Sequence, residues 1–77
     1  MNKYIYSICE QDDFPYIDSI VAKSYSHAIE KLIKKFVDRF DDDDEITDIS
    51  TFEVLQEYLN ATYAIVISDL YDVDDFN

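Results

Sequence analysis

The sequence predicts a small α+β fold, a two-layer sandwich in which two helices cover one face of a three-stranded sheet. Three observations lead to this prediction. Apolar residues recur at helical spacing over residues 24–40, two strand-like segments precede them, and a nearly continuous apolar run lies close to the C-terminal end. The expected order of elements is therefore strand, strand, helix, helix, strand (β-β-α-α-β).

The helix expected over residues 24–40 is the centre of this fold. Its apolar residues would form one buried face: Tyr25, Ala28, Ile29, Leu32, Ile33, Phe36, Val37 and Phe40. His27 and the charged residues of the segment fall on the opposite face. Ser24 or Ser26 can begin the helix, because a serine oxygen accepts a hydrogen bond from a free backbone N–H of the first turn.

Two strands are expected before that helix. Residues 3–9 alternate, with Tyr4, Tyr6 and Ile8 on one face, and they are rich in the aromatic and β-branched residues typical of strands. Residues 16–22 form the second strand. The loop between the two is short, so we expect them to pair antiparallel.

The second helix is predicted from about residue 51 to residue 60. An acidic run over residues 41–45 must end the first helix, because carboxylates are unfavourable at the negative pole of a helix, and we expect it to be a solvated loop. Residues 50–53, Ser-Thr-Phe-Glu, form a capping box, and Ile49 and Val54 are placed for a hydrophobic staple.

The last strand is expected over residues 62–68, which are almost continuously apolar. Such a run is typical of a strand that is covered on both faces. If it joins the sheet beside the first strand, the two should be parallel, with a right-handed crossover. Residues 1–77 would then make one domain, with residues 69–77 as an acidic tail.

The composition excludes several classes of function. The chain has no Gly, which excludes phosphate-binding Gly loops and dinucleotide-binding fingerprints. Cys9 is the one cysteine, so no internal disulfide can form, and this fits a reducing cytoplasm. No segment is long and apolar enough for a membrane span, so no membrane partner is expected.

Two groups of residues resemble chemical sites, but each has a simpler interpretation. Cys9 and His27 could act as nucleophile and base, but nothing fixes their distance, and a packed thiol with a surface imidazole is the favoured interpretation. Residues 41–53 resemble a calcium loop, yet neither register supplies both the Gly and the acid at position 12. We therefore expect no enzyme activity, no catalytic residue, no metal and no cofactor.

The acidic residues are segregated. The net charge is −12; residues 1–40 hold six acids and six bases, whereas residues 41–77 hold twelve acids and neither Lys nor Arg. An acidic surface can simply keep a protein soluble. However, clustered carboxylates also imitate the phosphates of a duplex, which carries about one charge per 1.7 Å of helix axis. Aromatic residues among them can stack on Arg: Tyr58, Tyr63, Tyr71 and Phe76.

In its second half the chain resembles the small acidic phage-encoded inhibitors that mimic DNA, including anti-CRISPR proteins. The resemblance is compositional and rests on the acidic runs at residues 41–45 and 69–75, with the acids between them. It implies a stoichiometric inhibitor that occupies a basic groove of a host nucleic-acid-binding protein, such as a Cas effector nuclease, in the cytoplasm of a bacterial host. The alternative is a small acidic adaptor that docks on another protein through residues 70–76.

The expected partner-binding residues are Asp41, Asp42, Asp43, Asp44, Glu45, Asp48, Glu53, Glu57, Asp69, Tyr71, Asp72, Asp74, Asp75 and Phe76. No direct contact with nucleic acid is expected, because a chain of this charge is repelled by phosphates.

Overall fold

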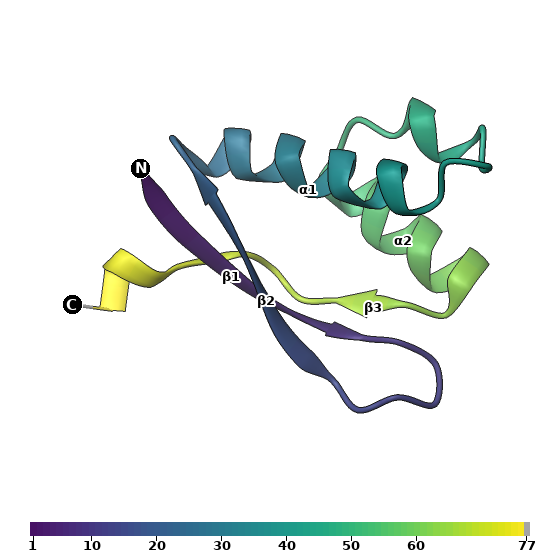
Figure 1. Ribbon diagram of the computed structural model, residues 1–77, viewed down its shortest axis with the longest axis horizontal. Helices are drawn as coiled ribbons and strands as arrows, with labels where there is room; N and C mark the ends of the chain where they lie inside the picture. The colour runs from purple at the N-terminus through teal and green to yellow at the C-terminus, as the bar shows by residue number, and fades with distance from the viewer. Residues whose placement is uncertain (77) are drawn as a thin grey trace.

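The computed structural model describes residues 1–76, and only the backbone of Asp75 and Phe76. It is an α+β fold in which an antiparallel four-stranded sheet packs against two helices (Figure 1), so the predicted fold class is confirmed. The elements in chain order are β1 (Asn2–Cys9), β2 (Tyr16–Ala22), α1 (Tyr25–Arg39), η1 (Ile46–Asp48), α2 (Phe52–Tyr63), β3 (Val66–Ile67), β4 (Tyr71–Asp72) and η2 (Val73–Phe76).

β1 is the central strand of the sheet. It pairs antiparallel with β2 along its length, while β3 pairs with its last residues and β4 with its N-terminal half. Between β3 and β4 the chain stays on β1, because the Ser68 N–H donates to the Ser7 carbonyl at 3.0 Å and the Ser7 N–H donates to Ser68 Oγ at 2.8 Å. β3 and β4 therefore lie one after the other along the same side of β1. The sheet has four strands where three were expected, because this edge is divided into two short strands.

The helix α1 follows the prediction closely. The Ser24 hydroxyl accepts a hydrogen bond from the His27 N–H at 3.2 Å, so Ser24 is the N-cap. Ala28, Leu32 and Phe36 are fully buried in the middle of its apolar stripe. Tyr25 differs from the expectation: its side chain stays 48% exposed at the start of the helix.

The core lies between the sheet and the two helices. The expected inward face of β1 is confirmed, because Tyr4, Tyr6 and Ile8 are all at most 4% exposed. The other buried apolar residues come from every part of the chain: Ile20, Ala22, Ala28, Leu32, Phe36, Ile46, Phe52, Leu55, Leu59, Ile65, Ile67 and Leu70.

The start of α2 lies one residue later than the predicted capping box requires. The N-cap is Thr51, whose hydroxyl accepts a hydrogen bond from the Val54 N–H at 3.3 Å, so the capping box built on Ser50 is wrong. Val54 is 48% exposed and is no longer at the staple position opposite Ile49. Phe52 and Leu55, on the first turns of α2, are buried in the core.

The predicted strand over residues 62–68 is mostly wrong. α2 continues to Tyr63, and Ala64 then adopts a left-handed conformation with φ 56° and ψ 36°. The Ala64 N–H donates to the Asn60 carbonyl and the Ile65 N–H donates to the Leu59 carbonyl. The bond from Ala64 is the 5→1 bond of the αL motif, which ends the helix. Only Val66 and Ile67 remain in β3, and Val66 is 56% exposed, so this segment is not covered on both faces.

The last strands are antiparallel to β1, and the expected parallel arrangement is wrong. In Figure 1 the connector between the helices turns back over the end of α1, so that α1 and α2 both run toward the right of the view. The chain therefore leaves α2 at that side and returns along β1 in the opposite direction.

Candidate functional site

Three basic residues of α1 are used within the fold. Lys31, Lys35 and Arg39 follow one another at intervals of four residues, on the side of α1 that faces β2. Lys31 Nζ donates to the Val21 carbonyl at 2.6 Å, Lys35 pairs with Asp18, and Arg39 pairs with Glu10. These cations therefore connect α1 to β2 and to the residue that follows β1.

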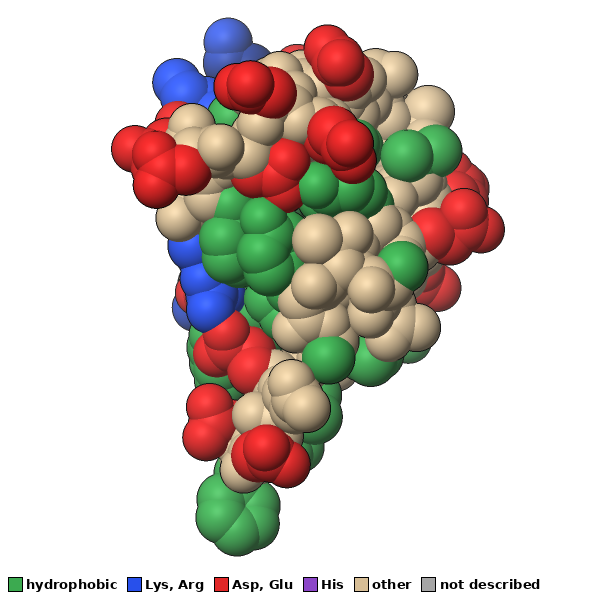
Figure 2. Space-filling view, turned by 90° about the vertical axis from the view of Figure 1, so that its right-hand side faces the viewer, with side chains coloured by type: hydrophobic (Ala, Val, Ile, Leu, Met, Phe, Trp, Pro, Cys, Tyr) green, Lys and Arg blue, Asp and Glu red, His purple; other side chains and the backbone are tan. Residues whose placement is uncertain are grey.

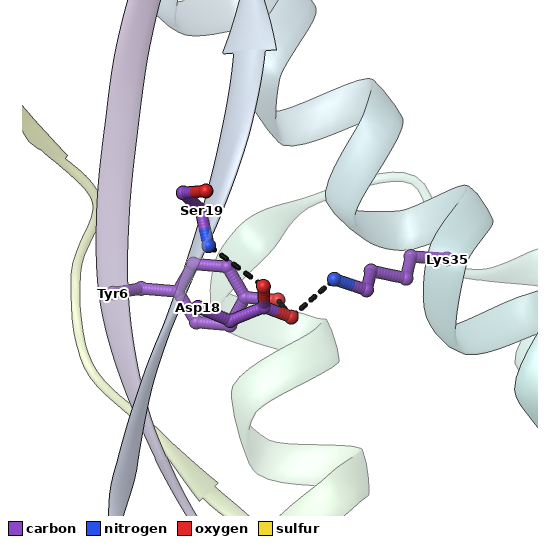
Figure 3. Close-up of polar contacts among 4 residues, drawn as sticks. All are labelled: Tyr6, Asp18, Ser19 and Lys35. Carbon is purple, nitrogen blue, oxygen red and sulfur yellow. Dashed lines mark hydrogen bonds and ion pairs between the residues drawn. The ribbon is translucent and has the colours of Figure 1, made fainter.

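Asp18 joins β1, β2 and α1 (Figure 3). Its carboxylate accepts hydrogen bonds from Lys35, from the Ser19 N–H at 2.8 Å and from the hydroxyl of the buried Tyr6 at 3.1 Å. The hydrogen bond from Lys35 holds the pKa of Asp18 below its ordinary value, and burial raises the pKa of Tyr6. Asp18 is thus a structural carboxylate with partners on three elements.

The acids of the second half have a different environment. Among the residues that the structure describes, the ion pairs are those of Asp18 and Glu10, both in the first half. We call residues 41–48 the acidic connector. Its solvent-exposed carboxylates are Asp41, Asp42, Asp44, Glu45 and Asp48. In Figure 2 acidic side chains are spread over the face that contains this end of the molecule, while Lys and Arg are confined to one border.

Asp43 is the exception in the acidic connector, because its carboxylate is half-buried and bonded within the fold. It accepts hydrogen bonds from the hydroxyls of Tyr58 and Tyr63, the latter at 2.6 Å, and from the Glu45 N–H at 3.0 Å. The hydrogen bonds from the two tyrosines lower its pKa, and the bond to Asp43 raises the pKa of Tyr58 to about 12. Asp43 therefore fixes the connector to α2.

Tyr58 and Tyr63, two of the aromatic residues that could stack on a partner's Arg, are engaged inside the molecule. The Tyr63 ring stacks on Phe40 with centroids 4.0 Å apart, and Tyr58 meets Tyr63 edge-on at 6.2 Å. A hollow of about 580 Å³ lies beside this cluster, lined by residues 39–45 and Tyr63. The connector therefore presents its carboxylates on a packed aromatic support.

The structure divides the predicted site residues into two groups. The molecule measures 38 × 27 × 18 Å, and the acidic connector lies at one end of the long axis, while residues 69–74 lie toward the other end, with both termini (Figure 1). Asp69 and Glu53 line the same hollow, which the connector does not reach, and Glu57 is one turn further along α2. The side chains of Asp75 and Phe76 are outside the described residues.

The segment predicted as an acidic tail is partly built into the fold. Leu70 is 6% exposed, and Tyr71 and Asp72 pair with β1. The Asn2 side-chain amide also donates to Asp72 at 2.9 Å. Within residues 69–74, Asp69, Tyr71 (52% exposed) and Asp74 remain open to solvent.

A second hollow, of about 680 Å³, was not predicted from the sequence. It lies between the first turns of α1 and α2 and residues 69–71. Its walls come from three distant segments, and the signal that could have indicated it is Tyr25, an aromatic residue at the exposed end of the α1 stripe.

Cys9 and His27 do not form a nucleophile–base pair. Cys9 ends β1, and its thiol lies 3.9 Å from the carbonyls of Glu10 and Asp13. His27 follows β2, whose last residue pairs with Asn2 at the other end of β1, and a strand of this length spans about 23 Å. In the described part of the chain no three His, Cys, Asp or Glu side chains converge to hold a metal ion.

None of the helices in residues 1–76 is long and apolar enough to cross a bilayer. Comparison of the chain with protein-family models, with curated proteins and with solved structures finds no match.

Proposed function

We propose that the protein is a stoichiometric inhibitor that occupies a basic groove of a nucleic-acid-binding protein and excludes nucleic acid from it. The observation that carries this proposal is the separation of charges in the fold. Lys31, Lys35 and Arg39 are bound to groups of the first half of the chain, whereas the exposed carboxylates of the acidic connector have no ion-pair partner among the described residues.

The dimensions of the molecule support mimicry of a duplex. The long axis is 38 Å, with acidic groups at both ends, and one turn of B-DNA spans about 34 Å. A groove that binds a duplex over one turn could therefore meet carboxylates at both of its ends. Such complementarity raises the rate of association with a basic partner and disfavours neutral ones.

The proposed partner class is a host nuclease or another protein with a groove lined by Lys and Arg. The resemblance to DNA-mimicking phage inhibitors makes a Cas effector nuclease in a bacterial cytoplasm the first target to test. The adaptor that docks through residues 70–76 has less support, because Leu70 is buried and Tyr71 and Asp72 belong to the sheet.

Competition with nucleic acid tests the proposal. The full chain is immobilised, a bacterial lysate is passed over it, and the bound proteins are eluted with duplex DNA or with sodium chloride of the same ionic strength. We expect the duplex to release nucleic-acid-binding proteins that the matched salt leaves bound. Captured proteins that stay bound at saturating duplex, or that have no affinity for nucleic acid, would contradict the proposal and favour the adaptor.

A further inference from the structure

The hollow between the two helix starts has an apolar floor. We call it the helix-start groove, and it has a volume of about 680 Å³. Its floor is formed by Ile29, Phe52 and Leu70; Phe52 and Leu70 are 8% and 6% exposed and belong to the core. Pockets that hold small ligands have volumes of about 300–1,000 Å³, so this groove has room for two medium-sized side chains.

Two tyrosines form the walls of the helix-start groove. Tyr25 and Tyr71 are 48% and 52% exposed, and both line the groove. The Tyr25 ring packs edge-on against the buried Tyr4 with centroids 6.1 Å apart, so its position is fixed by the core. An exposed aromatic ring that is held from behind is a suitable surface for an apolar or a cationic side chain.

The rim of the groove is negative. It carries Glu30, Glu53 and Asp69, none of which has an ion-pair partner among the described residues, and no Lys or Arg lines the groove. Burial and the charges of Asp69 and Glu53 raise the pKa of Tyr25, as expected if these carboxylates lie close to its ring. The two helix N-termini contribute about +0.5 charge each, which three full negative charges outweigh.

We propose that the helix-start groove binds an amphipathic segment of a protein partner, with an Arg over Tyr25 between Glu53 and Asp69 and a neighbouring apolar side chain on the floor. Arg fits better than Lys, because its planar guanidinium stacks on an aromatic ring and bonds carboxylates through a fork of donors. The inference rests on the proposed function in one respect, the basic character of the partner, and adds a contact that the connector does not make.

Other occupants fit this groove less well. A second copy of the chain carries a charge of −12 and would bring like charges together. The open face of the sheet is also partly apolar, with Ile17 and Val21 exposed, but the charged residue opposite Val21 is Lys3, which would repel a basic partner. The helix-start groove combines an apolar floor with unpaired charges.

The test is an NMR titration of the 15N-labelled full chain with the peptide acetyl-Gly-Leu-Arg-Leu-Arg-Gly-amide at 0.1 M salt. The comparison peptide has citrulline in place of both arginines, which keeps the shape and removes the charge. We expect chemical-shift changes centred on Tyr25, Phe52 and Asp69, with markedly weaker binding of the citrulline peptide.

Two double variants distinguish binding in the groove from non-specific electrostatic attraction to an acidic protein. E53Q/D69N removes two charges from the rim. Its affinity for the Arg peptide should be at least about tenfold lower, a loss that corresponds to about 1.4 kcal/mol of binding free energy. E57Q/D74N removes two charges outside the groove, and its affinity for the Arg peptide should stay within about threefold of that of the unchanged protein. Thermal melts of both variants check that the fold is intact.

Three outcomes would overturn the inference. They are shift changes centred on residues 41–45, an equal loss of affinity in both double variants, and groove signals that move with protein concentration alone, which would indicate a second copy as the occupant. The titration contains neither nucleic acid nor a captured protein. Its failure therefore leaves the result of the DNA competition unchanged, and the failure of that competition leaves the titration unchanged.

Discussion

The hydroxyl of Tyr63 donates a hydrogen bond to Asp43 Oδ2 at 2.6 Å, while the Tyr63 ring stacks on Phe40. One carboxylate of the acidic connector is therefore part of the packed structure, whereas its neighbours Asp42 and Asp44 face the solvent. The connector thus combines an acid that holds it in place with acids available to a partner, and substitutions can separate the two roles.

Replacing Asp43 should destabilise the protein, whereas replacing Asp42 should not. D43N removes the charge that accepts the hydrogen bonds from Tyr58 and Tyr63, and hydrogen bonds to charged groups are stronger than those between neutral groups. We expect its Tm to fall by several degrees. D42N removes an exposed charge among like charges, so its Tm should be unchanged or slightly higher. Equal melting temperatures would mean that Asp43 does not fix the connector.

The stability of the protein should decline in alkaline solution. The hydrogen bond to Asp43 raises the pKa of Tyr58 from 10.0 to about 12, so the folded state holds the proton more tightly than the unfolded state. This contribution is fully present below pH 10 and is lost as the pH rises toward 12. Thermal melts between pH 8 and about 12 should show the decline.

The variant Tyr58→Phe is the control for this pH dependence. It lacks the titrating hydroxyl, so its Tm should fall less steeply above pH 10 than that of the unchanged protein. A residual slope is expected in both, because burial also raises the pKa of Tyr6. Identical slopes would show that Tyr58 titrates alike in the folded and unfolded states.

Replacing Ala64 with glycine should stabilise the protein. Ala64 has φ 56°, a conformation that costs an L-residue roughly 1 kcal/mol and glycine almost nothing. We expect Ala64→Gly to raise the free energy of unfolding by about 0.5–1 kcal/mol, although the unfolded chain gains some freedom. Ala61→Gly, within α2 at an exposed position, should lower it by up to about 1 kcal/mol. If chemical denaturation shows that both substitutions change the free energy of unfolding in the same direction, the left-handed conformation at Ala64 would be ruled out.

Salt should stabilise the protein. Within the described residues the ion pairs are those of Lys35 with Asp18 and Arg39 with Glu10, so most carboxylates repel one another. The Debye length falls from about 30 Å at 0.01 M to about 10 Å at 0.1 M, which screens this repulsion. We expect Tm to rise over this range and to rise less in D41N/D42N/D44N. A flat or falling Tm would show that the carboxylates are too dispersed to interact.

The parts of the fold that could be predicted are those with a local signal. The alternation of Tyr4, Tyr6 and Ile8 indicates β1, and the apolar stripe centred on Leu32 indicates α1, because a single face of each element is buried. The cap at Ser24 also depends only on neighbouring residues. These signals do not depend on how the chain returns to the sheet.

The errors lie where tertiary packing decides between similar local patterns. The apolar run that contains Tyr63 and Ile65 suits a helix end as well as a strand, and Ala64, a residue that rarely adopts positive φ, marks the boundary. The direction of β3 depends on the path of the connector, which no short motif specifies.

The sequence predicts which residues the candidate site contains, but it does not predict how they are arranged in space. The sequence identifies the acids at residues 41–45, but it does not distinguish Asp43 from Asp42, because the difference arises from two tyrosines on α2. The helix-start groove is likewise formed by residues that are far apart in the chain, such as Tyr25 and Asp69.

The most direct test of the proposed function is the salt dependence of binding to a captured nucleic-acid-binding protein. Two variants remove three exposed charges each: D41N/D42N/D44N in the acidic connector, and D12N/D13N/D38N in the first half of the chain. Asp43 is left in place so that the connector keeps its fold. We expect the connector variant to lose at least about tenfold in affinity and to show a shallower slope of log affinity against log salt, while the other variant stays within about threefold. Equal effects of the two variants, or none from either, would contradict the proposal that the connector takes the place of phosphates.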